Sequence, residues 1–301
     1  MIKKLKKVVV VVVVFTIFFF QQNFCVILEQ LVKNKAVDKF FQGKVVGFYL
    51  GSFDPLHVGH ERIAEMVVKL KNSSGDNFCN SVLVYPTWGK DNYKPKSPIE
   101  ARLKILEAVF ADHQDVIITF LPPKKLQQLL FKQSFIRVPS RLQWLFAKKD
   151  PLHFNFGIKE FIGILGSDNA LKLGLPSSDP EEEESRKAHL EIYMRGLVIP
   201  KEYEEHSLGS VMAIPVAKFI VAIRSEDDID ELNNMIVDRP IIGVFNVDSS
   251  SLRTSSTEIR RIVSSSERLS EISGELKHKI HPRVLSLIYD ENLYNSKSDP
   301  A

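Results

Sequence analysis

The sequence predicts an α/β fold with a doubly wound parallel sheet and helical insertions. The first strand-like run, residues 45–50, is continuous rather than alternating, which is typical of a strand covered by helices on both faces. Further apolar runs alternate with helical patterns, and strand–helix–strand units of this kind make right-handed crossovers between parallel strands. The further strand candidates are residues 80–85, 115–120, 159–165, 217–224 and 241–247.

Residues 45–60, VVGFYLGSFDPLHVGH, form the stretch around which the other elements are arranged. The apolar run ends at Gly51, where the lack of a Cβ allows a tight turn and the close approach of a ligand. Gly59 then opens a helical pattern, so that free amide groups and the positive end of the helix dipole lie beside His57 and His60. This is a place where an anion such as phosphate would bind. The apolar positions on one face of the helix are Ile63, Val67 and Leu70.

A second helix is predicted within residues 97–110, SPIEARLKILEAVF. Ser97 is expected to act as the N-cap, with Pro98 in the first turn and Glu100 completing a capping box. The apolar positions make one stripe that we assign to the core: Ile99, Leu103, Leu106 and Phe110.

The composition is that of a globular protein. The chain has 301 residues, 44% of them apolar, which allows one large or two small domains. The formal net charge is +3, but the first 24 residues hold four lysines and no acid, and without them the charge is −1. The basic balance therefore does not indicate a nucleic-acid partner. The two cysteines, Cys25 and Cys79, make neither a disulfide framework nor a metal-ligand spacing.

Residues 1–24 resemble an export signal or a membrane anchor, because lysines precede an uninterrupted apolar stretch over residues 8–20. This stretch is shorter than the ~20 residues that span a bilayer as a helix, which favours a signal peptide, although no small-x-small cleavage site follows. We therefore expect the chain to be exported or tethered to a membrane. The alternatives are an extra hydrophobic strand or a start codon further downstream, in a cytoplasmic protein.

The remaining stretches are assigned from their composition. Residues 25–43 are expected to form a short amphipathic connector, residues 44–295 one domain, and residues 296–301 a disordered tail. Basic and aromatic residues are mixed over residues 124–154, but leucines at helical spacing favour an amphipathic helical insertion over a groove for single-stranded nucleic acid. Four consecutive glutamates within residues 176–210 indicate a solvated, mobile loop.

A second candidate motif is GILGSDNALKL, in which a predicted strand ends just before Gly166 and Asp168. A carboxylate beyond the end of a strand can accept hydrogen bonds from the hydroxyl groups of a ribose. Asp168 could equally cap a helix that begins at Asn169. The residues themselves leave both interpretations open.

A third motif follows the strand IIGVFNV, where the stretch SSTEIR opens another helix. Hydroxyl and amide groups at a helix start, with an arginine one turn later, make a second phosphate site, since guanidinium offers paired donors to phosphoryl oxygens. Capping alone would explain a serine but not Arg260. The candidate residues are Ser255, Ser256, Thr257 and Arg260.

The stretches GSFDPLHVGH and SSTEIR, in this order, resemble the HxGH nucleotidylyltransferases, and in particular the nicotinamide/nicotinate mononucleotide adenylyltransferases. The C-terminal HPRVLSLIYDENLY is similar to the last helix of the same group, and the resemblance covers residues 44–295. Two departures leave the base of the mononucleotide open. The segment YPTWGKDNYKPKSP replaces a proline-histidine-lysine segment, and no tryptophan closely follows Asp168, so Trp88 and Trp144 are the substitutes considered for stacking on the base.

The resemblance implies a Rossmann-like nucleotidylyltransferase fold and an adenylyl transfer from ATP to nicotinamide or nicotinate mononucleotide. The catalytic residues would be His57, His60 and Arg260. Mg²⁺ would be held mainly by the ATP phosphates and water, without a protein ligand. No nucleic-acid partner is expected, and no oligomeric state is predicted. The residues implied in nucleotide binding are Gly51, Ser52, Phe53, Gly59, Gly166, Asp168, Ser255, Ser256 and Thr257.

Three alternatives belong to other classes. A related adenylyltransferase or cytidylyltransferase would use phosphopantetheine, FMN or an alcohol phosphate as the acceptor. A catalytically silent nucleotide-binding protein would keep the fold, although the presence of both histidines and Arg260 argues against it. A membrane-tethered structural protein is indicated by residues 1–24 alone.

Overall fold

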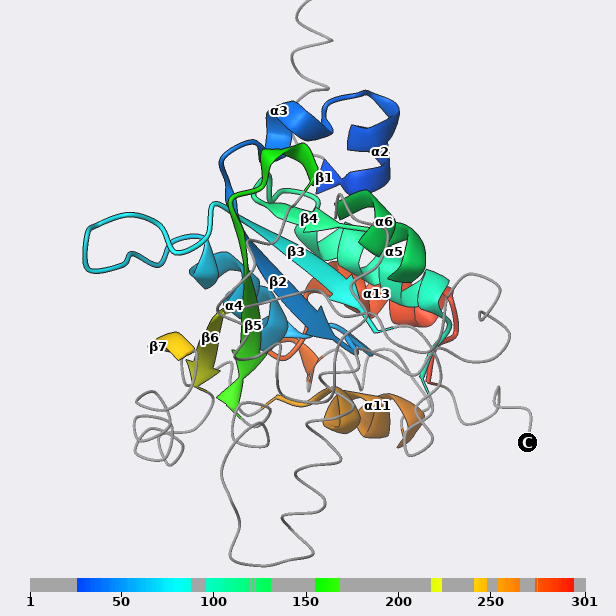
Figure 1. The fold of residues 1–301 in the computed structure, drawn as a ribbon. Helices are drawn as coiled ribbons and strands as arrows, with labels where there is room; N and C mark the ends of the chain where they lie inside the picture. The colour runs from blue at the N-terminus through cyan, green and yellow to red at the C-terminus, as the bar shows by residue number, and fades with distance from the viewer. Residues whose placement is uncertain are drawn as a thin grey trace, which may run out of the picture.

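In the computed structural model, seven strands form a single sheet in which every pairing is parallel (Figure 1). The strand order is β1-β4-β3-β2-β5-β6-β7. From β2 the chain moves outward to β3 and β4 and then returns to the other side of β2 at β5. The switch point of this doubly wound sheet therefore lies between β2 and β5. The structure describes residues 26–87, 96–119, 121, 123–130, 155–167, 218–223, 241–247, 254–265, 274 and 276–294.

All five further strands that the sequence predicts are present, and the predicted fold class is confirmed. Each lies within one or two residues of the expected bounds. The strands are β1 (Val26–Ile27), β2 (Val45–Gly51), β3 (Ser81–Pro86), β4 (Val116–Ile118), β5 (Glu160–Gly166), β6 (Lys218–Ile223) and β7 (Ile241–Asn246).

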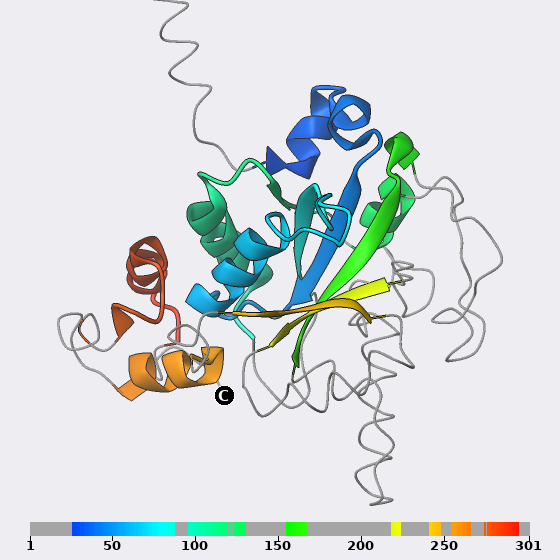
Figure 2. The same cartoon turned by 90° about the vertical axis from the view of Figure 1, so that its left-hand side faces the viewer.

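Helices cover both faces of the sheet (Figures 1 and 2). On β3, Val82 and Val84 pack into the core beneath α4, α5, α11 and α13, whereas Leu83 and Tyr85 pack into the core beneath α2, α3 and α6. This alternation explains why the central strands are apolar at every position. The helices are α2 (Leu28–Lys33), α3 (Val37–Phe41), α4 (Val58–Val67), α5 (Ile99–Phe110), α6 (Pro123–Leu130), α11 (Ser256–Ser265) and α13 (Pro282–Asp290), with a 3₁₀ turn η1 (Asn155–Gly157).

Residues 26–41 belong to the fold, which corrects the prediction of a connector over residues 25–43. The strand β1 pairs with β4 at the edge of the sheet. Leu28 and Phe41, from α2 and α3, are fully buried in the core of one face. A two-residue strand is too short to show a hydrophobic pattern, and its role became visible only through its pairing.

The start of α5 also differs from the prediction. Its N-cap is Pro98, without a side-chain capping bond, so the capping box of Ser97 and Glu100 does not form. The amide group of Ser97 instead donates to Asp54 Oδ2 at 2.9 Å. The predicted apolar stripe of this helix is confirmed as buried, at Ile99, Leu103, Leu106 and Phe110.

Several sequence-based predictions fall outside the described residues. These are the N-terminal segment, the tail at residues 296–301, the loop at residues 176–210 and most of the insertion at residues 124–154. The described part of that insertion, α6, is helical and buries Leu126 and Leu130, as its spacing predicted. Among the helices that the structure describes, none combines the length and the apolar character needed to cross a membrane.

The first turn of α4 carries a half-buried acid, Glu61. Burial, and then the neighbouring charge of Glu65, raise the pKa of Glu61 from 4.5 to about 7, while Arg62 acts in the opposite direction. The folded state therefore binds this proton more tightly than the unfolded state. As a result the folded protein loses stability as the pH rises from about 4.5 to about 7, and the loss is complete above pH 7.

We expect Glu61→Gln to remove the loss of stability that the folded protein undergoes as the pH rises. Stability at pH 8 should rise by about 1–2 kcal/mol over the unsubstituted protein, after allowing for the solvent-exposed part of the side chain. At pH 4 the two proteins should be equally stable, because the acid is then neutral in both states. Urea unfolding at both pH values measures the difference, with the exposed Glu100→Gln as a control. An equal effect at pH 4 and pH 8 would contradict the assignment.

Candidate active site

The turn after β2, residues 51–57, lies at the carboxyl end of the strand and next to the switch point. A Cβ atom added to Gly51 would lie 2.7 Å from the ring of Phe53, so the glycine makes room for this ring. Phe53 is fully buried at a φ of 49°, and its ring packs edge-on against Tyr49 and His60. Any contact of Phe53 with a nucleotide would therefore come from its main chain. The predicted turn is confirmed, and the ring of Phe53 packs into the space beside Gly51.

The two histidines use the same nitrogen to stabilise the start of α4. His57 is the N-cap, and its Nδ1 accepts a hydrogen bond from the amide of Gly59 at 3.1 Å. The Nδ1 of His60 accepts from the amide of His57 at 3.4 Å. A neutral imidazole that accepts at Nδ1 carries its proton on Nε2. Both rings, whose centroids are 3.8 Å apart, therefore have Nε2–H as a donor, which is what a phosphate oxygen requires.

The helix α11 docks directly onto the turn after β2 (Figure 1). Ser256 Oγ donates to the carbonyl oxygen of Pro55 at 2.9 Å, and Arg260 Nη1 donates to the carbonyl oxygen of Asp54. Arg260 Nη2 also donates to Thr257 Oγ1 at 3.2 Å, which fixes the orientation of the guanidinium. Two motifs separated by some 200 residues of sequence are thus in direct contact.

The serines at the start of α11 use part of their hydrogen-bonding capacity within the protein, which leaves less of it for a ligand than the sequence indicates. Ser255 Oγ accepts from the amide of Glu258 at 3.1 Å and so caps the helix. The only hydroxyl hydrogen of Ser256 is donated to Pro55 and is not available to a phosphate in this arrangement. The donors left for an anion at this helix are main-chain amides, the hydroxyl hydrogens of Ser255 and Thr257 and the remaining N–H groups of Arg260.

Gly166 lies on the same edge of the sheet as this turn. Because Tyr49 pairs with Ile164 in adjacent parallel strands, Gly166 reaches the level of Gly51. Ser167, the next residue, is fully buried. Asp168 lies outside the described residues, so its contact with a ribose stays a prediction.

Comparison with known proteins identifies the family. Residues 48–262 match the cytidylyltransferase-like family. The chain belongs to this family. It is therefore an enzyme, a nucleotidyltransferase, in agreement with the resemblance seen in its two motifs.

Individual relatives of this nucleotidyltransferase are distant. A protein of Fusobacterium nucleatum subsp. nucleatum, named "Probable nicotinate-nucleotide adenylyltransferase", is 23% identical over 235 residues, which are 78% of this chain and 94% of that protein. Two structures of Plasmodium falciparum nicotinic acid mononucleotide adenylyltransferase are 18% identical in a complex with APC and 20% identical in a complex with NaAD, with TM-scores of 0.47 and 0.46. Each covers 83% of this chain and 97% of its own.

Two residues of this nucleotidyltransferase site, Asp54 and Arg102, were not singled out from the sequence. Asp54 is 1% exposed and Arg102 is 2% exposed. Arg102 donates to the carbonyl oxygens of Ser52 and Thr87, both at 2.9 Å, and to that of Ser97 at 3.1 Å. It thereby joins the turn after β2 to the end of β3 and to the start of α5. Burial lowers the pKa of Arg102, and the neighbouring charge of Asp54 opposes this.

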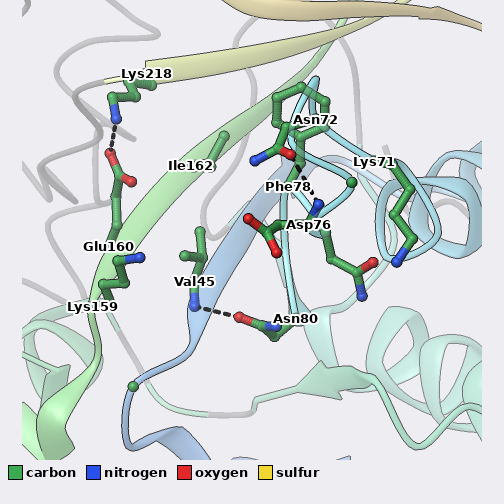
Figure 3. A pocket seen from close by; sticks show the side chains of 13 residues that line it. Val45, Lys71, Asn72, Asp76, Phe78, Asn80, Lys159, Glu160, Ile162 and Lys218 are labelled. Carbon is green, nitrogen blue, oxygen red and sulfur yellow. Dashed lines mark hydrogen bonds and ion pairs between the residues drawn. The ribbon is translucent and has the colours of Figure 1, made fainter.

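A pocket of about 620 Å³ lies at the opposite edge of the sheet (Figure 3). Val45, Glu160 and Lys218, the first residues of β2, β5 and β6, line it together with the loop before β3. Lys218 Nζ binds Glu160 at 2.9 Å across its rim (Figure 3). Ligands of doubly wound sheets bind beyond the carboxyl ends of the strands, so the candidate active site is the turn after β2 and not this pocket.

Arg102→Met should destabilise the fold strongly. The substitution leaves three inward-facing carbonyl groups without a donor and leaves the buried charge of Asp54 without its positive neighbour, which we expect to cost about 3 kcal/mol. Urea unfolding measures this change in the free energy of unfolding. Arg62→Met is the matched control, because Arg62 is exposed and binds Glu65 in an i,i+3 pair worth about 0.5 kcal/mol at most. Equal effects of the two substitutions would contradict the role of Arg102.

Proposed function

We propose that this nucleotidyltransferase transfers the adenylyl group of ATP to a pyridine mononucleotide, with nicotinate mononucleotide as the favoured acceptor, forming the deamido form of NAD and pyrophosphate. The observation that carries the proposal is the docking of α11 on the turn after β2, through the bonds of Ser256 and Arg260 to Pro55 and Asp54. It brings the start of α11 next to the turn that leads into α4, and helix starts are places where phosphate groups can bind. The Fusobacterium relative, similar over 94% of its length, supports nicotinate as the base.

The acceptor's own phosphate serves as the nucleophile in this reaction. One of its oxygens forms a bond to the α-phosphorus of ATP, and the bond from that phosphorus to the bridging oxygen breaks, so that the electron pair leaves with pyrophosphate. An ionised phosphate needs no general base. The enzyme therefore contributes alignment of the two phosphates and stabilisation of the charge that grows on the bridging and non-bridging oxygens.

The two helix starts divide this work. The Nε2–H groups of His57 and His60 would donate to the α- and β-phosphates, where charge develops. Arg260 and the amides at the start of α11 would hold the β- and γ-phosphates. His57 is buried and His60 is partly exposed, so the first position is held rigidly and the second is open to the nucleotide.

Mg²⁺ would neutralise charge on the triphosphate, and the residues of the turn fit an ion held by ATP and water rather than by the protein. The only carboxylate in the turn is that of Asp54, and both of its oxygens already accept hydrogen bonds, from Ser97 and Tyr294. A separate group, Glu61, Glu65 and His113, brings ligand atoms within 4.8 Å of one another. Two of its members lie further along α4, behind the histidines, so we assign it no part in the reaction.

Turnover with different substrate pairs tests the function. We would assay the full chain with ATP or CTP, in each case with nicotinate mononucleotide, nicotinamide mononucleotide, phosphopantetheine or FMN. Efficient turnover of ATP with nicotinate mononucleotide is the expected result. Preference for CTP, or for phosphopantetheine or FMN, would assign the chain to another branch of the family. No turnover with any pair would indicate a catalytically silent nucleotide-binding protein.

We expect His60→Ala to lower kcat by at least ~100-fold, because loss of one donor to the developing charge typically costs ~3 kcal/mol in the transition state. The KM for ATP should change much less. His278→Ala, which removes an exposed histidine far from the turn in sequence, is the control and should leave turnover unchanged. Near-normal turnover of His60→Ala would rule out the role assigned to this histidine.

We expect Arg260→Lys to raise the KM for ATP several-fold. One ammonium group cannot reproduce the paired donors of a guanidinium that already binds Asp54 and Thr257. The control is Arg261→Lys, at the exposed neighbouring position on α11. An unchanged KM for ATP would show that Arg260 only holds α11 in place.

A further inference from the structure

We propose that Tyr294 is a positioning residue for adenylyl transfer, which acts through Asp54 to align the turn after β2 with Arg260. Tyr294 lies four residues beyond the end of α13, far from the two phosphate motifs in the sequence. The inference rests on the proposed function, because this alignment affects turnover only if the turn and Arg260 hold nucleotide phosphates.

Asp54 receives hydrogen bonds from three separate parts of the chain. The Tyr294 hydroxyl donates to Asp54 Oδ1 at 2.5 Å, and the amide of Ser97 donates to Asp54 Oδ2 at 2.9 Å. Arg260 donates to the main-chain oxygen of the same residue. The carboxylate and the carbonyl group of Asp54 are only a few bonds apart, so a change at one is transmitted to the other. Tyr294 and Arg260 therefore act on the same turn.

Loss of the hydrogen bond from Tyr294 to Asp54 destabilises the folded protein. Asp54 is 1% exposed, and a buried carboxylate that loses a donor keeps an uncompensated part of its charge. Burial, and then the charge of Asp54, raise the pKa of Tyr294, so the phenol stays protonated and acts as the donor. Tyr294 also adopts a φ of 64°, a backbone conformation that non-glycine residues rarely take. The charge-assisted bond to Asp54 compensates for this local strain.

Turnover is more sensitive to this bond than nucleotide binding is. Removing the hydroxyl leaves the two histidines and Arg260 in place to bind ATP. The Asp54–Pro55 segment, to which Arg260 and Ser256 are bonded, loses one of its fixed points. A small displacement of the phosphates from the in-line geometry lowers the rate of transfer while the ground-state complex keeps its contacts. The effect should therefore appear in kcat and not in KM.

A second contact of the same C-terminal segment provides a matched control. Glu291, three residues before Tyr294, forms an ion pair with Lys104 of α5 at 2.6 Å, and both side chains are exposed. Glu291→Gln loosens the attachment of this segment to α5 without touching Asp54. A general role of the C-terminal segment in stability predicts similar effects of Glu291→Gln and Tyr294→Phe. A positioning role predicts an effect on turnover for Tyr294→Phe alone.

The test is steady-state kinetics of the full chain with ATP and nicotinate mononucleotide, together with thermal unfolding. We expect Tyr294→Phe to lower kcat by about 10-fold with the KM for ATP changed by less than about threefold, and Glu291→Gln to keep kcat within about twofold. We also expect Tyr294→Phe and Arg260→Lys to be non-additive in kcat/KM for ATP, because both act through the same turn. Strictly additive effects, or an unchanged kcat of a folded Tyr294→Phe protein, would overturn the proposal.

Two further measurements keep the test conclusive. If Tyr294→Phe does not fold, Asp54→Asn takes its place, since an amide presents an oxygen to only one of the two donors, and the same loss of kcat at a constant KM is expected. The wild-type protein is assayed in parallel. A wild-type enzyme that is active and a Tyr294→Phe protein of equal kcat would overturn the positioning role alone. A wild-type chain without adenylyl transfer would overturn the proposed function, and the positioning role with it.

Discussion

The carboxylate of Asp54 is 1% exposed, and a charge so far from water is stable only where donors surround it. The donors are the amide of Ser97 and the hydroxyl of Tyr294, while Arg102 supplies a neighbouring positive charge. They come from the start of α5, from the chain after α13 and from the interior of α5. Satisfying this one charge therefore fixes how three parts of the chain meet at the turn after β2. In the proposed function this turn lies beside the phosphates of the nucleotide.

The contact between the starts of α4 and α11 likewise depends on negative groups that compensate positive ones. Both helices present their N-terminal ends to the turn, and two positive dipole ends close together are unfavourable unless negative groups lie between them. In the protein, the carbonyl oxygens of Asp54 and Pro55 occupy this place and accept from Arg260 and Ser256. A triphosphate would add a larger negative charge at the same point. A bound nucleotide would thus offset part of the electrostatic cost of bringing the two helix starts together.

The features with local patterns were predictable from the sequence. The sheet was visible because its central strands are apolar on both faces, and α4 because Ile63 and Val67 fall on one side of a helix that opens beside His57. The apolar stripe of α5 was equally clear. In each case, the side chains that decide the structure lie within one or two turns of each other along the chain.

The features that depend on distant partners were not predictable in this way. The stretch from Ser97 to Glu100 matches a capping box, but Asp54, which is 43 residues earlier, takes the amide of Ser97. The ring of Phe53, which a Cβ atom at Gly51 would meet at 2.7 Å, is a further reason for this glycine that the sequence did not indicate. Arg102 did carry a signal, because it follows Ile99 by three residues and precedes Leu106 by four, which places a charge on the buried face of α5.

The same contacts hold the chain that follows β3 next to the turn. Arg102 binds the carbonyl oxygens of Thr87 and Ser97, and Lys96 Nζ donates to Thr87 Oγ1 at 3.3 Å, so both ends of the segment between these residues are fixed next to the turn. This segment contains the part of the sequence that departs from the pattern of the family. Arg102 therefore ties both ends of this segment to the turn that would hold the phosphates in the proposed function.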